Sequence, residues 1–146
     1  MPRIRQGAAF AVALLAIWSS PALSKVLITT AEARLPDDTF VRRDSFPGPK
    51  IILEIPPPNG GAASSPLHLR IRFEPRGAQI DPNTLYVRYK KLPAVDLTDR
   101  LREFTTTSGI DMQSAELPPG AHHISVDIKD ADGASGHLDF LLSVTQ

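Results

Sequence analysis

Apolar and polar side chains alternate without a break along residues 67–74. The apolar positions of this segment are Leu67, Leu69, Ile71 and Phe73. A two-residue period places one set of side chains on each face of a β-strand, so that one face is buried and the other is solvated. Residues 85–90 alternate in the same way, and residues 50–55 form a β-branched apolar run that ends at three consecutive prolines. Because proline cannot donate to a sheet ladder, that run stops there, and we predict a strand in each of the three segments.

The last thirty residues predict a β-hairpin, because a short polar loop separates two alternating apolar rows. Both rows can lie on one face of an antiparallel pair only if the loop contains an odd number of residues. A three-residue loop that ends at Gly133 meets this condition, with the glycine in the left-handed position of a type I turn followed by a G1 bulge. The resulting register pairs Asp127 with His137 and Val126 with Leu138.

Residues 25–49 have no sustained period and contain three prolines, which predicts an N-terminal arm rather than a long element. Thr29 and Glu32 have the spacing of a capping box, so we expect one helical turn that ends before Pro36. Three apolar side chains would attach the arm to the rest of the protein, and without them the arm is a flexible leader. These side chains are Phe40, Val41 and Phe46.

Residues 96–104 allow two interpretations. Leu97 and Leu101 are four positions apart, and Asp96 could cap a short helix ahead of them. We favour a crossover turn between two sheets for this segment. Residues 105–117 then predict one or two short strands around a glycine, with Ile110 and Met112 facing inward.

The first 24 residues have the pattern of a secretory signal peptide. Arg3 and Arg5 precede an apolar run over residues 8–18, and Ala22 and Ser24 are the small residues expected before a cleavage site. The apolar run is shorter than the about 20 residues that span a bilayer. We therefore expect residues 1–24 to be removed on export, leaving a periplasmic or secreted protein without a membrane anchor.

The composition changes this picture in two ways. The absence of cysteine excludes both a disulfide framework and a lipoprotein anchor, so the stability of the fold must come from its apolar core. The signal peptide holds two of the sixteen cations and none of the sixteen acids, which leaves the mature chain slightly acidic. This balance predicts no general affinity for nucleic acid or for anionic membranes.

About seven short strands without a long helix predict an all-β fold, an antiparallel β-sandwich. The C-terminal part of the chain resembles a known family in three features, a Pro-Pro-Gly turn, an alternating strand and an Asp/Gly hairpin. The residues concerned are Leu117, Pro118, Pro119, Gly120, His122, Ile124, Val126, Ile128, Asp130, Asp132 and Gly133. This pattern resembles bacterial immunoglobulin-like and cadherin-like domains, and residues 51–58 resemble their first strand. The resemblance implies an immunoglobulin-like sandwich over residues 50–146 and a binding or spacer role outside the cytoplasm. The disulfide and core tryptophan of antibody domains are missing.

Three acids near the hairpin turn are candidate calcium ligands: Asp127, Asp130 and Asp132. An EF-hand loop is excluded, because the glutamate at its twelfth position has no counterpart here. Cadherin-like domains bind calcium between neighbouring repeats, and this chain has no second repeat. We favour the interpretation that Asp and Gly serve the tight turn itself, and we expect no bound metal or cofactor.

The four histidines do not match a zinc signature. His122 and His123 are adjacent, so in a strand they point to opposite faces. We place His137 outward on the next strand, in a weak surface ion pair with Asp127, and His68 in the opposite sheet.

The chain also lacks the residues of a nucleophilic enzyme, because it has neither cysteine nor a G-x-S-x-G motif, and Ser108 before Gly109 lacks that context. We treat Asp96 and Asp99 as solvated loop acids rather than as a glycosidase pair. Tyr86 is the only aromatic side chain that we expect to project outward for sugar stacking. Five cations form a candidate patch for an acidic polymer, although we expect them to be spread over two faces: Arg70, Arg72, Arg88, Lys90 and Lys91.

The sequence therefore favours an exported binding or structural module that is not an enzyme. We expect it to contact another envelope or extracellular protein through a sheet edge or a loop end, because a free strand edge offers unpaired backbone groups. A calcium-stabilised adhesive module is the main alternative, and a small hydrolase is the third.

Overall fold

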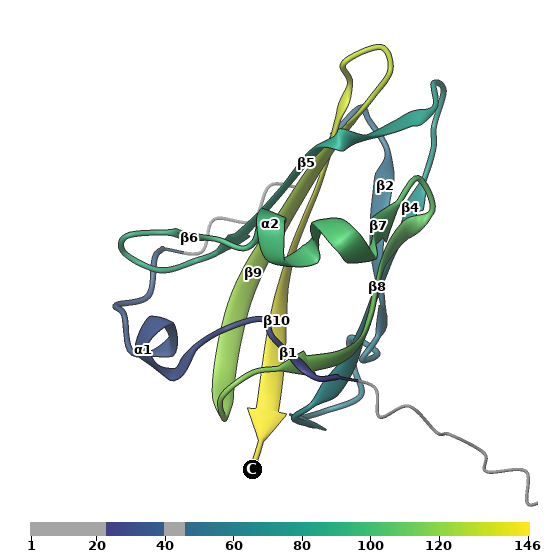
Figure 1. Ribbon diagram of the computed structural model, residues 1–146. Helices are drawn as coiled ribbons and strands as arrows, with labels where there is room; N and C mark the ends of the chain where they lie inside the picture. The colour runs from purple at the N-terminus through teal and green to yellow at the C-terminus, as the bar shows by residue number, and fades with distance from the viewer. Residues whose placement is uncertain (1–22, 40–45) are drawn as a thin grey trace, which may run out of the picture.

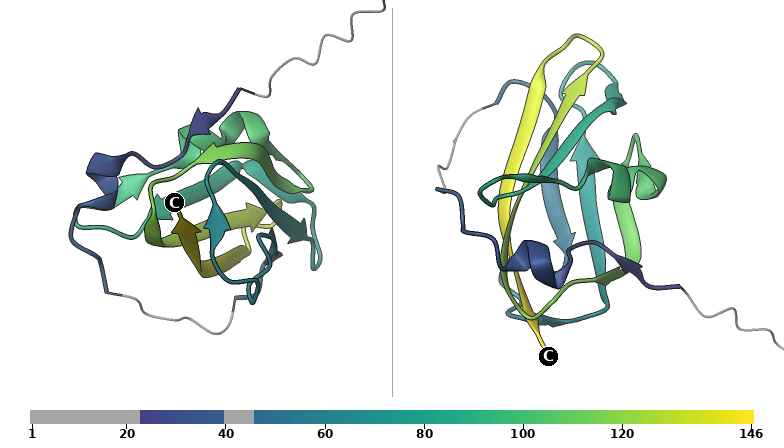
Figure 2. Two further views of the ribbon diagram at one scale, coloured as in Figure 1. Left: turned by 90° about the horizontal axis from the view of Figure 1, so that it is seen from below. Right: turned by 60° about the vertical axis from the view of Figure 1, so that its left-hand side comes forward.

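The computed structural model describes residues 23–39 and 46–146. Two β-sheets pack face to face, with the short helices at one side (Figures 1 and 2). The first sheet has the order β1 (Lys25–Val26), β8 (Gly109–Glu116), β4 (Leu67–Glu74) and β2 (Lys50–Ile55), and β7 (Thr105–Thr106) also pairs with β8. The second sheet has the order β3 (Ala63–Ser64), β10 (Ser135–Thr145), β9 (Gly120–Asp130), β5 (Ile80–Tyr89) and β6 (Val95–Asp96). The predicted all-β sandwich is confirmed.

The sheets are not purely antiparallel. The long strands pair in antiparallel fashion, but β1 runs parallel to β8 and β3 runs parallel to β10, each over two residues. The predicted strands at residues 50–55 and 67–74 have the bounds that the structure gives to β2 and β4. The strand predicted at residues 85–90 is longer at its start, because β5 begins at Ile80. Its first half pairs irregularly with β9, which hides the two-residue period there.

The hairpin of β9 and β10 has the predicted register. Asp127 lies opposite His137 and Val126 lies opposite Leu138. The amide of Gly133 donates to the Asp130 carbonyl at 3.0 Å, and Gly133 has a φ of +82°. That left-handed conformation is the one that glycine adopts without cost, which is why the odd loop length can be realised here.

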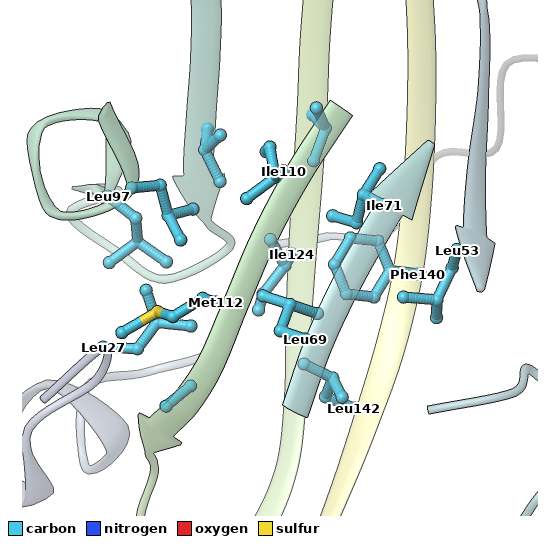
Figure 3. Packing of buried hydrophobic residues seen from close by; sticks show 14 of the residues in the cluster. Leu27, Leu53, Leu69, Ile71, Leu97, Ile110, Met112, Ile124, Phe140 and Leu142 are labelled. Atoms are coloured by element: carbon cyan, nitrogen blue, oxygen red, sulfur yellow. The ribbon is translucent and has the colours of Figure 1, made fainter. Parts of the chain in front are cut away.

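The core lies between the two sheets and contains the apolar side chains of every long strand (Figure 3). Leu69, Ile110 and Ile124 come from β4, β8 and β9 and are almost completely buried. Met112 also faces inward, as predicted. Because these positions follow the two-residue period of their strands, the burial pattern explains why the sequence forms strands there.

The N-terminal arm is part of the packed structure. It contributes strand β1 and the helix α1 (Thr30–Ala33), which begins with the predicted capping box of Thr29 and Glu32. Leu27 and Ile28 are buried in the core. Of the three side chains expected to attach the arm, Phe46 packs on the His137 ring at 4.9 Å between centroids. The other two, at positions 40 and 41, lie outside the described residues.

Residues 96–104, for which the sequence allowed a short helix or a crossover turn, form both. The segment forms the helix α2 (Thr98–Leu101) and the 3-10 helix η1 (Arg102–Phe104), so the crossover turn that we favoured is helical. This segment carries the chain from β6 in the second sheet to β7 in the first. The Asp96 carboxylate accepts the amide of Thr98 at 2.8 Å. Leu97, rather than the predicted Asp96, is the N-cap residue of α2, so Asp96 contacts the first turn from the position before the cap.

The predicted signal peptide falls almost entirely on residues 1–22, which lie outside the described residues, and it stays a prediction. No helix in the described part of the chain has the length and apolar character to cross a bilayer.

Candidate functional site

The outer edge of β10 is covered only at its two ends. At its start, the Gly48 amide donates to the Ser135 carbonyl at 2.8 Å. At its end, Val144 and Thr145 pair with the two residues of β3. Between these contacts, no described strand pairs with residues 137–143 on the side opposite β9. A stretch of open strand edge therefore lies between two fixed ends.

The direction of the backbone groups on this edge follows from the hairpin. In an antiparallel pair, alternate residues direct their N–H and C=O groups toward the partner strand. The Asp130 amide donates to Ala134 within the hairpin, whereas the Ser135 carbonyl faces Gly48 on the other side. The odd-numbered residues of β10 therefore present their backbone groups to the open edge. These residues are His137, Asp139, Leu141 and Ser143.

Strand β2 forms the opposite wall, and no strand of the described residues pairs with its second edge. It pairs with β4 alone, and the Phe73 amide donates to Ser108 on the side of β8. By the same alternation, Ile51 and Leu53 direct their backbone groups away from β4, to the open edge of the first sheet. Figure 2 shows β2 and β10 side by side, and Figure 3 shows Leu53 near Phe140.

A hollow of about 550 Å³ lies between these two strands, and we call it the β2–β10 groove. Its walls are residues 51–53 of β2 and 138–141 of β10, and Pro58 and His123 complete it. Most of these side chains are apolar, and Leu141 is 50% exposed in the middle of the open edge. The groove therefore combines apolar walls with unpaired backbone groups, which is the combination that an added strand requires.

A polar cluster borders this groove on the outer face of the second sheet. His137 contacts Asp127 through Nδ1 at 2.6 Å and Asp139 through Nε2 at 2.7 Å. Burial opposes the charged ring, but the hydrogen bonds that His137 donates to Asp139 and Asp127 outweigh it and raise the pKa of His137. Because carboxylate oxygens only accept, both ring nitrogens donate when the ring is protonated. His137 lies on the outer face of its strand, as predicted. The predicted surface exposure is wrong, because Phe46 packs on the ring and only 9% of the side chain is exposed.

Three buried polar atoms of this face have no hydrogen-bond partner among residues 23–39 and 46–146. They are Arg88 Nε, Ser125 Oγ and Asp139 Oδ1. Ser125 lies opposite both Arg88 and Asp139 in the sheet, so the three residues form a row across β5, β9 and β10. Asp139 also lines the groove, and its side chain is 9% exposed. Because an unpaired buried oxygen is costly, it is a position at which a bound donor gains affinity.

The three candidate calcium ligands do not converge. Asp127 is held by His137 and lies 3.7 Å from Arg88, while the Asp130 carboxylate accepts the amides of Asp132 and Ala134 at 3.0 and 2.9 Å. Asp130 thus stabilises the turn, and Asp132 is exposed beyond it. Within residues 23–39 and 46–146, no group of three acidic or histidine side chains is arranged to hold a metal ion.

The remaining histidines are also engaged. The carbonyl of Pro118 accepts from His122 Nε2 at 2.7 Å, so Nδ1 accepts the Tyr89 hydroxyl at 2.8 Å. Burial lowers the pKa of His122, which favours the neutral form of the ring. His68 lies in the first sheet, as predicted, and contacts Asp111 at 2.6 Å.

The five cations of the candidate patch are divided between the sheets. Arg70 and Arg72 contact Glu54 on the first sheet. The cations in β5 and directly after it each contact an aspartate, Arg88 with Asp127, Lys90 with Asp38 and Lys91 with Asp37. Each charge is compensated by a neighbour, so the structure offers no continuous basic surface over the described residues. The outward position of Tyr86 is confirmed, and Arg88 packs on its ring at 5.2 Å.

The groove has no signal in any single stretch of the sequence. Contact through a sheet edge or a loop end was expected, but the two strands could not be named, because the partner of an edge strand is far away in the sequence. Comparison of the chain with known proteins finds no matching family model, no similar curated protein and no similar solved structure. The functional proposal therefore depends on this geometry alone.

Proposed function

We propose that this protein is an exported immunoglobulin-like module that binds another protein of the cell envelope or the extracellular space. The open edge of β10 beside the β2–β10 groove is the observation that carries this proposal. Exposed strand edges are the part of a β-sandwich that recruits further chains, because their backbone groups are unsatisfied.

The strand order supports the immunoglobulin-like assignment. Constant-type immunoglobulin domains pair strands A, B, E and D in one sheet and C, F and G in the other. The order β2-β4-β8 corresponds to A, B and E, and β10-β9-β5 corresponds to G, F and C. Strand D has no single counterpart, because β1 and β7 pair with the two ends of β8 in its place.

The state of the polar side chains favours binding over catalysis. A general base needs a free nitrogen or carboxylate oxygen within reach of a substrate. Both ring nitrogens of His137 and of His122 are already hydrogen-bonded within the fold. These histidines therefore serve the structure, and the groove is lined mainly by side chains without catalytic chemistry.

Site-specific photocrosslinking tests the proposal. The photoreactive residue p-benzoylphenylalanine is placed at Leu141 on the open edge or, as a matched control, at Leu92 on a loop, since the two leucines are 50% and 54% exposed. In cells that make the protein, we expect a discrete crosslinked partner from position 141 and none from position 92. Crosslinking from position 92 alone would refute contact through the sheet edge.

A further inference from the structure

We propose that the β2–β10 groove binds an extended peptide segment of the partner in which a cationic residue stands between two apolar residues. This inference rests on the proposed binding function and adds the chemistry of the ligand. The segment would continue the line of β3 along β10 and fill the open stretch of the second sheet.

The two ends of the groove set the length of the ligand. The Gly48 contact with Ser135 closes one end, and β3 occupies the other end at Val144. The open stretch of residues 137–143 spans about 20 Å at the rise of a β-strand, which corresponds to five to seven residues of an added strand. A helix cannot use this site, because its backbone groups are already satisfied internally.

The backbone requires an extended ligand. Four residues of β10 direct N–H and C=O groups to the open edge, and Ile51 and Leu53 direct theirs to the open edge of β2. A peptide strand supplies donors and acceptors at the matching spacing along its whole length. A compact small molecule would satisfy only one or two of these groups.

The side chains set the pattern of the ligand. Residues of an added strand opposite Leu138 and Phe140 point toward the core side of the sheet, where Ile51 and Leu53 form the far wall. The residue between them lies opposite Asp139 on the outer face. Apolar side chains therefore fit at the first and third positions of the ligand. The negative charge of Asp139 determines which side chain fits at the second position.

Asp139 favours a cation at that second position. It is the one acid among the described residues that line the groove, and no lysine or arginine lines it. Its Oδ2 atom is bound by His137, but its buried Oδ1 atom has no partner in the part of the chain that the structure describes. A lysine or arginine of the ligand would supply the missing donor, and opposite charges at facing positions of a sheet attract.

The same charge argues against a second copy of this chain as the occupant. The β10 sequence at the groove is Leu138-Asp139-Phe140, an acid between two apolar residues. A symmetric pair of β10 edges centred on Asp139 would bring two carboxylates together, which is destabilising.

A synthetic peptide with the core Val-Lys-Val, flanked by serines and labelled with fluorescein, tests the inference by fluorescence anisotropy with the full chain. A Val-Glu-Val peptide and a Val-Lys-Val peptide with N-methylated backbone are the controls. We expect the Val-Lys-Val peptide to bind about tenfold more tightly than the Val-Glu-Val peptide, and Asp139→Asn to reduce this preference to about threefold or less. The N-methylated peptide should not bind.

The matched variants Leu141→Pro and Leu141→Ala separate the backbone from the side chain. Proline at this position removes an N–H that β9 does not use, so the hairpin ladder is retained. We expect Leu141→Pro to weaken peptide binding about tenfold more than Leu141→Ala does. Amide hydrogen exchange on the unmodified chain is independent of any effect of proline on folding. There the amides of Asp139 and Leu141 should exchange more slowly when the Val-Lys-Val peptide is present.

Three outcomes would overturn the inference. The first is no protection of the Asp139 and Leu141 amides by the peptide, and the second is equal binding of the Val-Lys-Val and Val-Glu-Val peptides. The third is a dimer of the chain that Leu141→Pro dissociates, since the occupant would then be a second copy. If Leu141 still crosslinks to a discrete partner while the peptides fail to bind, the binding function stands and the ligand chemistry proposed here is wrong. If both experiments fail, the proposed function falls as well.

Discussion

Replacing Glu32 with glutamine should loosen the N-terminal arm from the sandwich in a pH-dependent manner. The Glu32 carboxylate contacts Arg100 of α2 through both oxygens, at 2.6 and 2.8 Å, and Arg100 also donates to the Leu27 carbonyl at 2.8 Å. The hydrogen bond from Arg100 is the main reason why the pKa of Glu32 falls from 4.5 to about 2, while partial burial opposes the shift. Glutamine can keep the capping contact with Thr29, so Glu32→Gln removes mainly the charge.

The size of the effect follows from linkage. A shift from 4.5 to about 2 would correspond to about 3 kcal/mol at 1.36 kcal/mol per pKa unit if the pair were fully shielded from water. The side chains of Glu32 and Arg100 are 19% and 32% exposed, so solvent screening reduces this figure. We expect Glu32→Gln to cost about 1–2 kcal/mol of unfolding free energy at pH 7, or roughly 4–8 °C in Tm.

The pH dependence distinguishes this cause from a general packing defect. Because the pKa of Glu32 is lower in the folded state, its contribution is complete above about pH 4.5 and is lost as the pH falls toward 2. Urea unfolding of both proteins between pH 2 and pH 7, followed by circular dichroism, should show the difference shrinking over that range. Glu103→Gln is the matched control, since the Lys25–Glu103 pair also joins the arm to this region but is largely exposed. A Glu32→Gln defect that is constant from pH 7 to pH 2, or a Glu103→Gln defect of equal size, would refute the reasoning.

Three further predictions concern the core, a strand pairing and the polar cluster. Leu69→Ala, at a completely buried position, should cost about 2–5 kcal/mol in urea unfolding, and no change in midpoint would contradict the assigned core. Gly109→Ala should destabilise far more than Gly133→Ala, because an added methyl group at Gly109 overlaps the β4 backbone whereas Gly133 has open space around it; equal losses of Tm would exclude this account. His137 should titrate by NMR above its ordinary value of 6.5, and Asp139→Asn should lower that midpoint. Because the folded pKa is raised, the stabilisation by His137 is present below pH 6.5 and is lost as the pH rises through the folded value.

The long strands could be predicted because their burial repeats every second residue. In β4 the polar positions His68 and Arg70 separate buried leucines, so a single window of sequence contains the whole signal. The hairpin register followed from parity, since a one-residue slip would have turned the row that contains Val126 and Ile128 away from the core. Both inferences use only neighbours in the sequence, which is why they were confirmed.

The role of the arm could not be predicted in the same way. Lys25–Val26 is a strand of two residues, too short for any period, and its partner in β8 is about ninety residues away. Leu27 and Ile28 are adjacent apolar residues that fit a strand, a helix or a loop equally well. His137 was misjudged for a related reason, because its cover comes from Phe46 at a distant point of the chain.

The open edge nevertheless has a cause in the sequence. Strand β2 could pair with β4 or continue along β10, because its apolar run suits either sheet. The three residues that follow Ile55 are prolines, which have no N–H to donate, so neither ladder can be extended through them. The chain returns to the second sheet only at Ala63, where β3 begins, and Pro58 remains as part of the groove wall. The proline run between β2 and β3 is therefore the sequence feature that leaves this edge of β10 without a described strand partner. Because the same prolines cannot extend a backbone ladder along β10, the open edge seen in the described residues follows from this sequence, and we propose that a partner strand pairs there.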